Sequence, residues 1–192
     1  MSQCFSENLL AGKVAFVAGG TRGINLGIAK AFACAGARVA VIGRDAERAA
    51  AAQADIEQAS GESALGMSCD VRDYAAVETA IKTTAEAFGK IDILVSGAAG
   101  NFFSPIVGLS ANAFKTVVDI DLIGTFNVFR ASFDYLTKPG ASLIAITAGQ
   151  AEHAVPFQAH AAAAKAGVNM LTKTLAVEWG PAGVRANLIA PG

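Results

Sequence analysis

The stretch "KVAFVAGG", residues 13–20, is a short apolar run that ends in glycines. The residues that follow it, "TRGINLGIAKAFACAGA" (21–37), change to helical spacing, with Ile24, Ile28 and Phe32 on one face. Such an apolar run predicts a buried strand, and the glycines after it predict a tight turn. Together the two stretches predict a strand, a turn and a helix.

The same unit recurs along the chain, which argues for a repeating α/β architecture. Almost all of the expected strands are apolar throughout, as is typical of a parallel sheet covered by helices on both faces. Residues 1–192 are therefore expected to form one α/β domain with a doubly wound parallel sheet. Further strands are expected at 38–43, 63–70, 91–97, 142–147 and 184–192, and helices at 45–60, 74–88, 114–136 and 157–179.

The charge balance excludes several classes of partner. Lys and Arg total 15 and Asp and Glu total 16, so the net charge is −1. This balance offers no basic surface for nucleic acid and no acidic tail. The longest uncharged stretch, Ile93–Phe114, is broken by glycines and a proline and does not read as a membrane span. We therefore expect a small-molecule substrate, with neither nucleic acid nor membrane as a partner.

The cysteines indicate a reducing compartment. The chain has three cysteines, Cys4, Cys34 and Cys69. Their number is odd, and their spacing is not that of a metal site. No signal peptide precedes them, which favours the cytoplasm. Cys34 and Cys69 are expected to be buried, unreactive thiols, and no metal site is expected.

The glycines after the first strand form the pattern "AGGTRGINLG", with Gly19, Gly23 and Gly27. A glycine-rich turn lets the backbone approach a pyrophosphate, whose charge then lies at the N-terminus of the following helix. Tight turns also need glycine for other reasons. The position in the first strand-to-helix turn of an alternating chain favours a dinucleotide site.

The order of these motifs resembles the short-chain dehydrogenase/reductase family over essentially the whole chain. The resemblance implies a Rossmann-like fold and a nicotinamide dinucleotide cofactor. The family's Gly-x-x-x-Gly-x-Gly turn falls on Gly19, Gly23 and position 25, where this chain has Asn25. A side chain at that position could crowd the cofactor phosphates or the contact between helix and strand.

Two arginines bear on the choice of cofactor. The second strand ends "VIGRD", which puts Arg44 where the 2′-phosphate of NADP would lie, and Arg22 is a second candidate. A guanidinium fork suits phosphate, so NADP is favoured over NAD, with a plain surface arginine as the alternative for Arg44. "CDV" at 69–71 resembles the family's adenine-binding Asp-Val step, although Asp70 could instead cap the next helix. The resemblance implies these cofactor-binding residues: Gly19, Thr21, Arg22, Gly23, Ile24, Arg44, Asp70, Val71, Ala98, Lys165, Pro191 and Gly192.

The region after the fourth expected strand narrows the resemblance. In "SGAAGNF", Ser96 and Gly97 replace both asparagines of the family's Asn-Asn-Ala-Gly motif. This variant and "AFKTVVDIDLIGTFNV" (113–128) resemble the 2,4-dienoyl-CoA reductases, most closely the peroxisomal type. The resemblance implies the NADPH-dependent reduction of an acyl-CoA-type substrate in fatty acid metabolism.

A lysine in the alanine run "AHAAAAKAG" (159–167) is central to the catalytic interpretation. In most of the family a tyrosine four residues earlier supplies the proton for carbonyl reduction, but here that position is Ala161, and the usual serine position is Ala148. The dienoyl-CoA reductases likewise keep the lysine without that tyrosine, so Lys165 is expected to bind the nicotinamide ribose. By the same resemblance, Asp121 and Lys165 arrange a proton-donating water, and Asn101 hydrogen-bonds the thioester carbonyl.

The chemistry explains why that tyrosine is dispensable. Hydride delivered to the far end of a conjugated dienoyl thioester makes an extended dienolate, whose charge rests on the thioester oxygen and needs hydrogen-bond donors. A proton is then supplied to carbon, so direct protonation of an alkoxide is not required.

Several alternatives stay open. Asp119 competes with Asp121, a solvated helix residue is the alternative for Lys165, and His160 is a secondary proton-donor candidate. The mitochondrial reductases use a tyrosine that would fall near Gln150, so that type fits less well. A carbonyl or alcohol dehydrogenase with another proton donor, and a non-catalytic dinucleotide-binding protein, are the rival functions.

Assembly and substrate contacts follow only from the resemblance. Family members are commonly tetramers through two long helices, here expected at 114–136 and 157–179, so a homotetramer is implied. They also continue beyond the final "APG" with a loop and helices that close over the substrate. Most acyl-chain contacts are therefore expected outside these residues.

Overall fold

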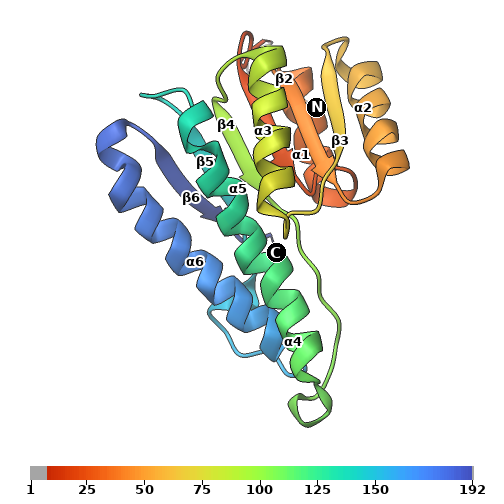
Figure 1. The fold of residues 1–192 in the computed structure, drawn as a ribbon, viewed down its shortest axis with the longest axis vertical. Helices are drawn as coiled ribbons and strands as arrows, with labels where there is room; N and C mark the ends of the chain where they lie inside the picture. The colour runs from red at the N-terminus through yellow and green to blue at the C-terminus, as the bar shows by residue number, and fades with distance from the viewer. Residues whose placement is uncertain (1–7, 192) are drawn as a thin grey trace, which may run out of the picture.

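The computed structural model describes residues 8–191. Parallel strands form one six-stranded sheet in the order β3-β2-β1-β4-β5-β6 (Figure 1). The chain runs outward from β1 through β2 and β3, then returns to the other side of β1 and runs outward through β4, β5 and β6. This confirms the predicted doubly wound parallel sheet. The strands are β1 (Val14–Ala18), β2 (Arg38–Gly43), β3 (Ala64–Ser68), β4 (Ile93–Ser96), β5 (Ser142–Ile146) and β6 (Arg185–Ile189).

Helices cover both faces of the sheet. On one face α1 (Gly23–Cys34) and α2 (Ala46–Ser60) bury apolar side chains such as Ala29, Ala33 and Ile56 against the sheet. On the other face lie α3 (Tyr74–Phe88), α5 (Gly124–Ser132) and α6 (Ala159–Trp179), which contribute Ile81, Phe129 and Val168 to a second core. These two apolar cores account for the apolar strands that the sequence shows.

The helix before α5 does not lie over the sheet. In Figure 1, α4 (Ala111–Val118) and the start of α6 extend beyond the strands, and the loop between β4 and α4 forms the narrow end. Ser110 caps α4, because its hydroxyl accepts a hydrogen bond from the Ala113 amide at 3.1 Å. Short 3₁₀ turns lie at η1 (Ile106–Gly108), η3 (Phe133–Tyr135), η4 (Gly149–Ala151) and η5 (Gly180–Ala182).

The helix expected over 114–136 is built differently from the prediction. It begins earlier, at Ala111, and contains a π-helical turn, η2 (Asp119–Ile123), between α4 and α5. The helix expected over 157–179 begins at Ala159 and ends at Trp179. The last strand ends at Ile189 instead of continuing to 192, because Pro191 has no N–H to donate to a ladder.

The cysteine prediction is half right. Cys69 is buried, and burial together with the nearby Asp70 and Asp73 raises the pKa of its thiol to about 11, so it is unreactive. The prediction that Cys34 is buried is wrong, because this last residue of α1 is exposed. Cys4 lies outside the described residues.

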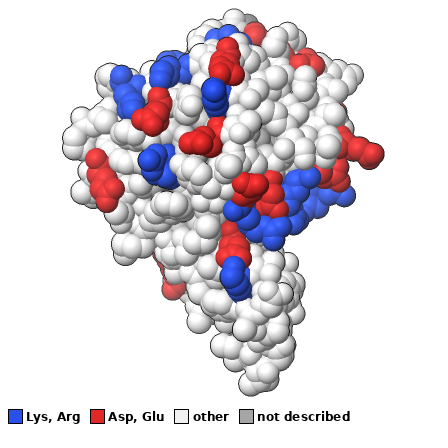
Figure 2. Space-filling model, in the orientation of Figure 1, with Lys and Arg blue, Asp and Glu red and all other residues white. Residues whose placement is uncertain are grey.

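Charges of both signs are mixed over the surface that Figure 2 shows, and the narrow end is almost free of charge. The loop between β4 and α4, which lies at that end in Figure 1, belongs to the uncharged run Ile93–Phe114. None of the helices within residues 8–191 has the length and apolar character needed to cross a membrane. The same residues contain no cluster of three or more His, Cys, Asp or Glu side chains able to hold a metal ion.

Candidate active site and dinucleotide cleft

A cleft of about 860 Å³ opens at the carboxyl ends of β1, β2 and β4. It lies where the strand order reverses, which is the place where open α/β sheets bind their ligands. The cleft is lined by eight of the residues implied for cofactor binding: Gly19, Thr21, Arg22, Gly23, Arg44, Asp70, Val71 and Ala98.

The glycine turn leaves this cleft open to the start of α1. A Cβ on Gly19 would lie 2.7 Å from backbone atoms of Ala98, so only glycine lets the two turns touch. Gly23 begins α1 with a φ of 58°, which glycine adopts without strain. The N-cap residue Arg22 makes no side-chain capping bond, whereas Asp45 and Asp73 cap α2 and α3. The first N–H groups of α1 are therefore free to receive a pyrophosphate, and the cleft fits a dinucleotide.

The charged residues at the β2 side of the cleft fall into two groups. Asp45 is engaged as the α2 cap and pairs with Arg48. Arg22 and Arg44 also line the cleft, and neither is in an ion pair with any other residue of the 8–191 segment. Two guanidinium groups are thus available for an anion.

Asp70 has a different role from helix capping. The Arg72 guanidinium hydrogen-bonds its carboxylate at 2.6 Å and lowers the pKa of that carboxyl. The next helix, α3, is capped by Asp73, so the alternative role of Asp70 as its cap is wrong. Asp70 remains on the cleft wall beside Val71.

Some expected cofactor residues are not part of the cleft lining. Ile24 lies with its side chain exposed, and Pro191 is exposed at the end of the described chain. Lys165 also lies outside the lining, in a polar cluster with Asp121, Asn101 and Gln158. Gly192 falls outside the described residues.

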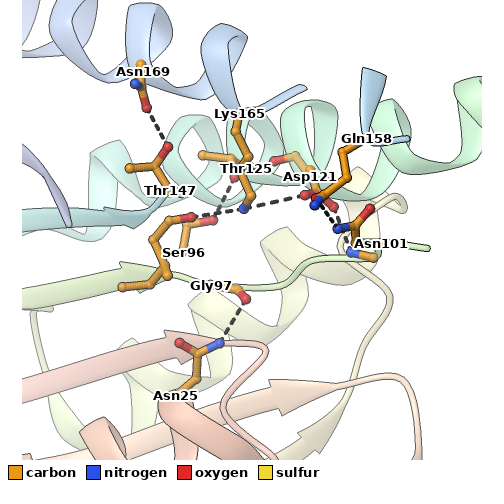
Figure 3. Close-up of polar contacts among 12 residues, drawn as sticks. Asn25, Ser96, Gly97, Asn101, Asp121, Thr125, Thr147, Gln158, Lys165 and Asn169 are labelled. Atoms are coloured by element: carbon orange, nitrogen blue, oxygen red, sulfur yellow. Dashed lines mark hydrogen bonds and ion pairs between the residues drawn. The ribbon is translucent and has the colours of Figure 1, made fainter. Parts of the chain in front are cut away.

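Lys165 and Asp121 form a buried ion pair. The Lys165 Nζ lies 3.4 Å from Asp121 Oδ2, and their side chains are 8% and 1% exposed. Nζ also donates a hydrogen bond to the Ile146 carbonyl at 2.9 Å, and the Gly100 N–H donates to Asp121 Oδ1 at 2.7 Å (Figure 3). The reading of Lys165 as a solvated helix residue is therefore wrong.

Burial dominates the electrostatics of this pair. It raises the pKa of the Asp121 carboxyl above its ordinary value of 3.8, while Lys165, the Gly100 N–H and the nearby His160 act in the opposite direction. A buried carboxyl with a raised pKa and one cationic partner is typical of groups that handle protons.

The π-helical turn explains why Asp121 and not Asp119 meets the lysine. Both residues lie in η2, but only Asp121 is buried; Asp119 forms an ion pair with Lys115 on the exposed side. A π turn shifts the helix register locally, and such turns are frequent at functional sites. The Asp121 carbonyl also accepts a hydrogen bond from Thr125, whose hydroxyl in turn accepts one from Ser96.

Asn101 lies at the start of the loop after β4, within the same polar cluster. Its Nδ2 donates to Gln158 Oε1 at 2.7 Å, and its Oδ1 accepts from the Phe102 N–H at 2.9 Å (Figure 3). Because an amide nitrogen has two N–H groups, one is left for a ligand. Sequence reasoning did not identify Gln158, since a glutamine ahead of a helix gives no distinctive signal.

The positions where most of the family has serine and tyrosine carry no hydroxyl. Ala161 is fully buried in α6, and Ala148 directly precedes η4. Thr147, next to Ala148, cannot take over, because it is buried and donates its hydroxyl hydrogen to Asn169 Oδ1 at 2.6 Å. The tyrosines, Tyr74 and Tyr135, pack against the second core, which lies between the sheet and the helices α3, α5 and α6.

His160 is a buried polar group without a partner. Its side chain is 0% exposed, its ring centroid lies 4.4 Å from that of Phe102, and neither ring nitrogen has a hydrogen-bond partner among the described residues. Unpaired nitrogens in an interior are costly. His160 therefore calls for a role beyond packing.

With this geometry in place, the class of protein is clear: the chain belongs to the short-chain dehydrogenase family. The sequence profile described as short chain dehydrogenase matches residues 13–192. A peroxisomal 2,4-dienoyl-CoA reductase from Saccharomyces cerevisiae is 46% identical over 188 residues, which cover 96% of this chain and 64% of the relative. A second, from Rattus norvegicus, is 44% identical over 98% of this chain and 65% of the relative. The chain thus spans less than two thirds of the length of these relatives.

Solved structures agree with the fold. A citronellol catabolism dehydrogenase from Pseudomonas aeruginosa superposes with a TM-score of 0.92 at 35% identity, covering 100% of this chain and 79% of that one. A short chain dehydrogenase from Burkholderia cenocepacia, in complex with NADP, gives 0.89 at 33% identity over 95% and 75% of the two chains.

Proposed function

We propose that the protein reduces a 2,4-dienoyl-CoA thioester with NADPH. The observation that carries the proposal is the buried Asp121–Lys165 pair beside Asn101, in a chain with alanine at the family's tyrosine position. The relatives named 2,4-dienoyl-CoA reductases support the same activity. An oxidoreductase of this type needs a hydride donor, a donor for the thioester oxygen and a source of one proton.

The cleft residues fit the hydride donor. A bound reduced nicotinamide supplies the hydride. The free N–H groups of α1 would hold the pyrophosphate, and Arg22 and Arg44 would hold a 2′-phosphate, which favours NADPH over NADH. Lys165 has three N–H groups and uses one on Ile146, so others are available for a ribose hydroxyl and for Asp121.

The polar cluster fits the rest of the reaction. Hydride adds to the far end of the conjugated system, and the electron pair moves through the double bonds to the thioester oxygen, where the free N–H of Asn101 would stabilise it. Asp121 and Lys165 would orient a water that gives its proton to carbon, and the pair would replace that proton.

The surroundings of Asn101 suit an acyl chain. Phe102, Phe103, Ile106 and Val107 come within six residues after Asn101 and are exposed. The loop between β4 and α4, to which they belong, forms the narrow end in Figure 1, and this end is nearly without charge in Figure 2. Apolar side chains on this scale rarely stay exposed without a ligand or partner.

The test is turnover by the full-length protein. NADPH consumption is followed with a 2,4-dienoyl-CoA, with a simple enoyl-CoA and with simple ketones. Consumption with the dienoyl-CoA, and little with ketones, supports the proposal. Consumption with ketones alone identifies a carbonyl reductase, and NADPH binding without any consumption identifies a non-catalytic dinucleotide-binding protein.

A homotetramer built on α5 and α6 is part of the proposal. Apolar residues on these helices, Phe126, Met170 and Val177, are exposed, and Val177 is 78% exposed. Phe126 also lines a groove together with Phe133 and Trp179. A second copy of the chain is the occupant that the family resemblance implies. Sedimentation of the full-length protein should give a tetramer, and Val177→Glu should give smaller species; a monomeric wild type contradicts this assembly.

The compartment also stays a proposal. The cysteines predict a reducing, cytoplasmic location, whereas the relatives are named peroxisomal. Imaging of the tagged full-length protein distinguishes the two.

A further inference from the structure

Asn25, the third residue of α1, joins two turns that are far apart in the sequence. Its Nδ2 donates a hydrogen bond to the Gly97 carbonyl at 2.8 Å and a longer one to the Gly19 carbonyl at 3.4 Å. Gly19 follows β1 and Gly97 follows β4, so a single amide connects both turns with the start of α1. Figure 3 shows the Asn25 side chain directed at Gly97.

Gly97 is the steric complement of Asn25. A Cβ on residue 97 would lie 2.4 Å from the amide oxygen and nitrogen of Asn25, closer than such atoms approach in proteins. Gly97 is not among the glycines with a positive φ, so its backbone conformation does not require glycine. The space that a Cβ at position 97 would take is therefore occupied by the Asn25 amide, which would have to move to admit it.

The two turns that Asn25 joins border the dinucleotide cleft. Gly19, Asn25, Gly97 and Ala98 all line it, and the turns already touch where Gly19 meets Ala98. β1 and β4 are the neighbouring strands at which the strand order reverses. A dinucleotide bound across this point must contact both turns, so their spacing determines the fit.

The remaining polar atom of Asn25 is available to a ligand. Its Oδ1 is buried and has no partner among the described residues. A reversed amide would set this oxygen against the Gly97 carbonyl, so the orientation with Nδ2 toward Gly97 is the favourable one. An unpaired acceptor in a cleft wall suits a water that is bound when the cleft is filled.

We propose that Asn25 is a cofactor-positioning residue: it fixes the spacing of the β1 and β4 turns for the dinucleotide, and Gly97 is the glycine that this amide requires. The inference rests on the proposed function only in taking a nicotinamide dinucleotide as the ligand. It replaces the expectation that Asn25 crowds the phosphates, because the amide is engaged with Gly97.

The experiment uses the full-length protein and four variants: Asn25→Ala, Gly97→Ala, the double variant, and Asn112→Ala as control. Asn112 is an exposed residue in the first turn of α4, so it matches Asn25 in residue type and helix position. Dissociation constants are measured by fluorescence for NADPH and by calorimetry for adenosine 2′,5′-bisphosphate. Thermal midpoints without ligand are recorded for each variant.

Asn25→Ala should weaken NADPH binding about three- to tenfold, the range for one lost hydrogen bond. Binding of the bisphosphate should change less, because this fragment does not reach the β4 turn. Gly97→Ala alone should weaken NADPH binding by about tenfold or more, since the new methyl displaces the amide. The double variant should bind within about twofold of Asn25→Ala, because the amide is gone. If Gly97→Ala does not fold, the double variant should fold again, because removal of the Asn25 amide makes room for the methyl group.

Equal NADPH affinity in wild type and Asn25→Ala, or single effects that simply add, would overturn the inference. Equal losses for NADPH and for the bisphosphate would also contradict it, because a general loss of structure affects both ligands. The predicted binding pattern without dienoyl-CoA turnover leaves the inference standing and removes the proposed function. Turnover of the dienoyl-CoA, with NADPH binding unchanged in Asn25→Ala, supports the proposed function and contradicts the inference about Asn25.

Discussion

The Lys165 ammonium and the Asp121 carboxylate, 3.4 Å apart, form the buried ion pair of the candidate active site, and they come from different helices. Both side chains are buried, so each depends on the other for compensation of its charge. The Ile146 carbonyl accepts a hydrogen bond from Lys165, and the Gly100 N–H donates one to Asp121. The pair lies in the interior of a chain that has no hydroxyl at the family's serine and tyrosine positions.

The first prediction concerns pH. Because burial raises the pKa of Asp121 above 3.8, the folded state keeps a proton that the unfolded chain has already released. The stability that Asp121 contributes is therefore largest below 3.8, falls as the pH rises through the raised pKa, and is level above it. Asp121→Asn removes this titration.

Urea unfolding of wild type and Asp121→Asn from about pH 4 to pH 7 measures the effect. The free energy of unfolding of the wild type, minus that of the variant, should fall over the lower part of this range. A difference that rises with pH would mean that Lys165 outweighs burial.

The second prediction concerns cofactor choice. Arg44→Ala should raise the dissociation constant for NADPH by about tenfold or more, as expected for loss of a charge-assisted hydrogen bond of ~1.5–3 kcal/mol. The value for NADH should stay within about twofold, because NADH lacks the 2′-phosphate. Fluorescence titration with both cofactors is the measurement, and Arg22→Ala should behave similarly.

Arg185, exposed on β6, offers the control for this experiment. Arg185→Ala should leave both dissociation constants unchanged. Equal affinities for NADPH and NADH in the wild type would remove the assignment of Arg22 and Arg44.

The fold was largely predictable, because most strands are apolar runs that alternate along the chain with helical stretches. The ends of the helices and strands were harder to predict. The helix expected from residue 114 begins at Ala111, because Ser110 caps it, and the strand expected to reach residue 192 ends at Ile189, ahead of Pro191. Asp121 could be chosen over Asp119 through resemblance, but the π turn that buries it has no evident sequence signal.

Contacts of the backbone and of unremarkable side chains could not be predicted. The Ile146 carbonyl and the Gly100 N–H exist in any sequence, and only the fold brings them to Lys165 and Asp121. Asn25 was recognisable as a departure from the family pattern. Its partnership with Gly97 depended on the distance between two turns, which sequence spacing does not give.

The third prediction concerns His160. His160→Leu should leave the free energy of unfolding unchanged or raise it by about 1 kcal/mol, because it removes buried nitrogens that have no partner. Turnover should nevertheless fall with little change in the KM for NADPH, since the ring lies close enough to Asp121 to affect its pKa.

His153, which is exposed, provides the matched control. His153→Leu should alter neither turnover nor stability. A His160→Leu variant that loses stability and keeps full turnover would show that the ring only fills space beside Phe102.

The most direct test of the Asp121–Lys165 pair is the turnover of a 2,4-dienoyl-CoA with NADPH by the full-length protein and its variants. Lys165→Met and Asp121→Asn keep side-chain volume, so they disturb the buried site less than alanine. Lys165→Met should weaken NADPH binding and slow turnover, whereas Asp121→Asn should mainly slow turnover, by about a hundredfold for loss of acid–base assistance. The double variant should be no slower than the slower single variant, because both residues serve one water. If Lys165→Met leaves kcat and the NADPH dissociation constant unchanged, the pair has no part in catalysis and the account is contradicted.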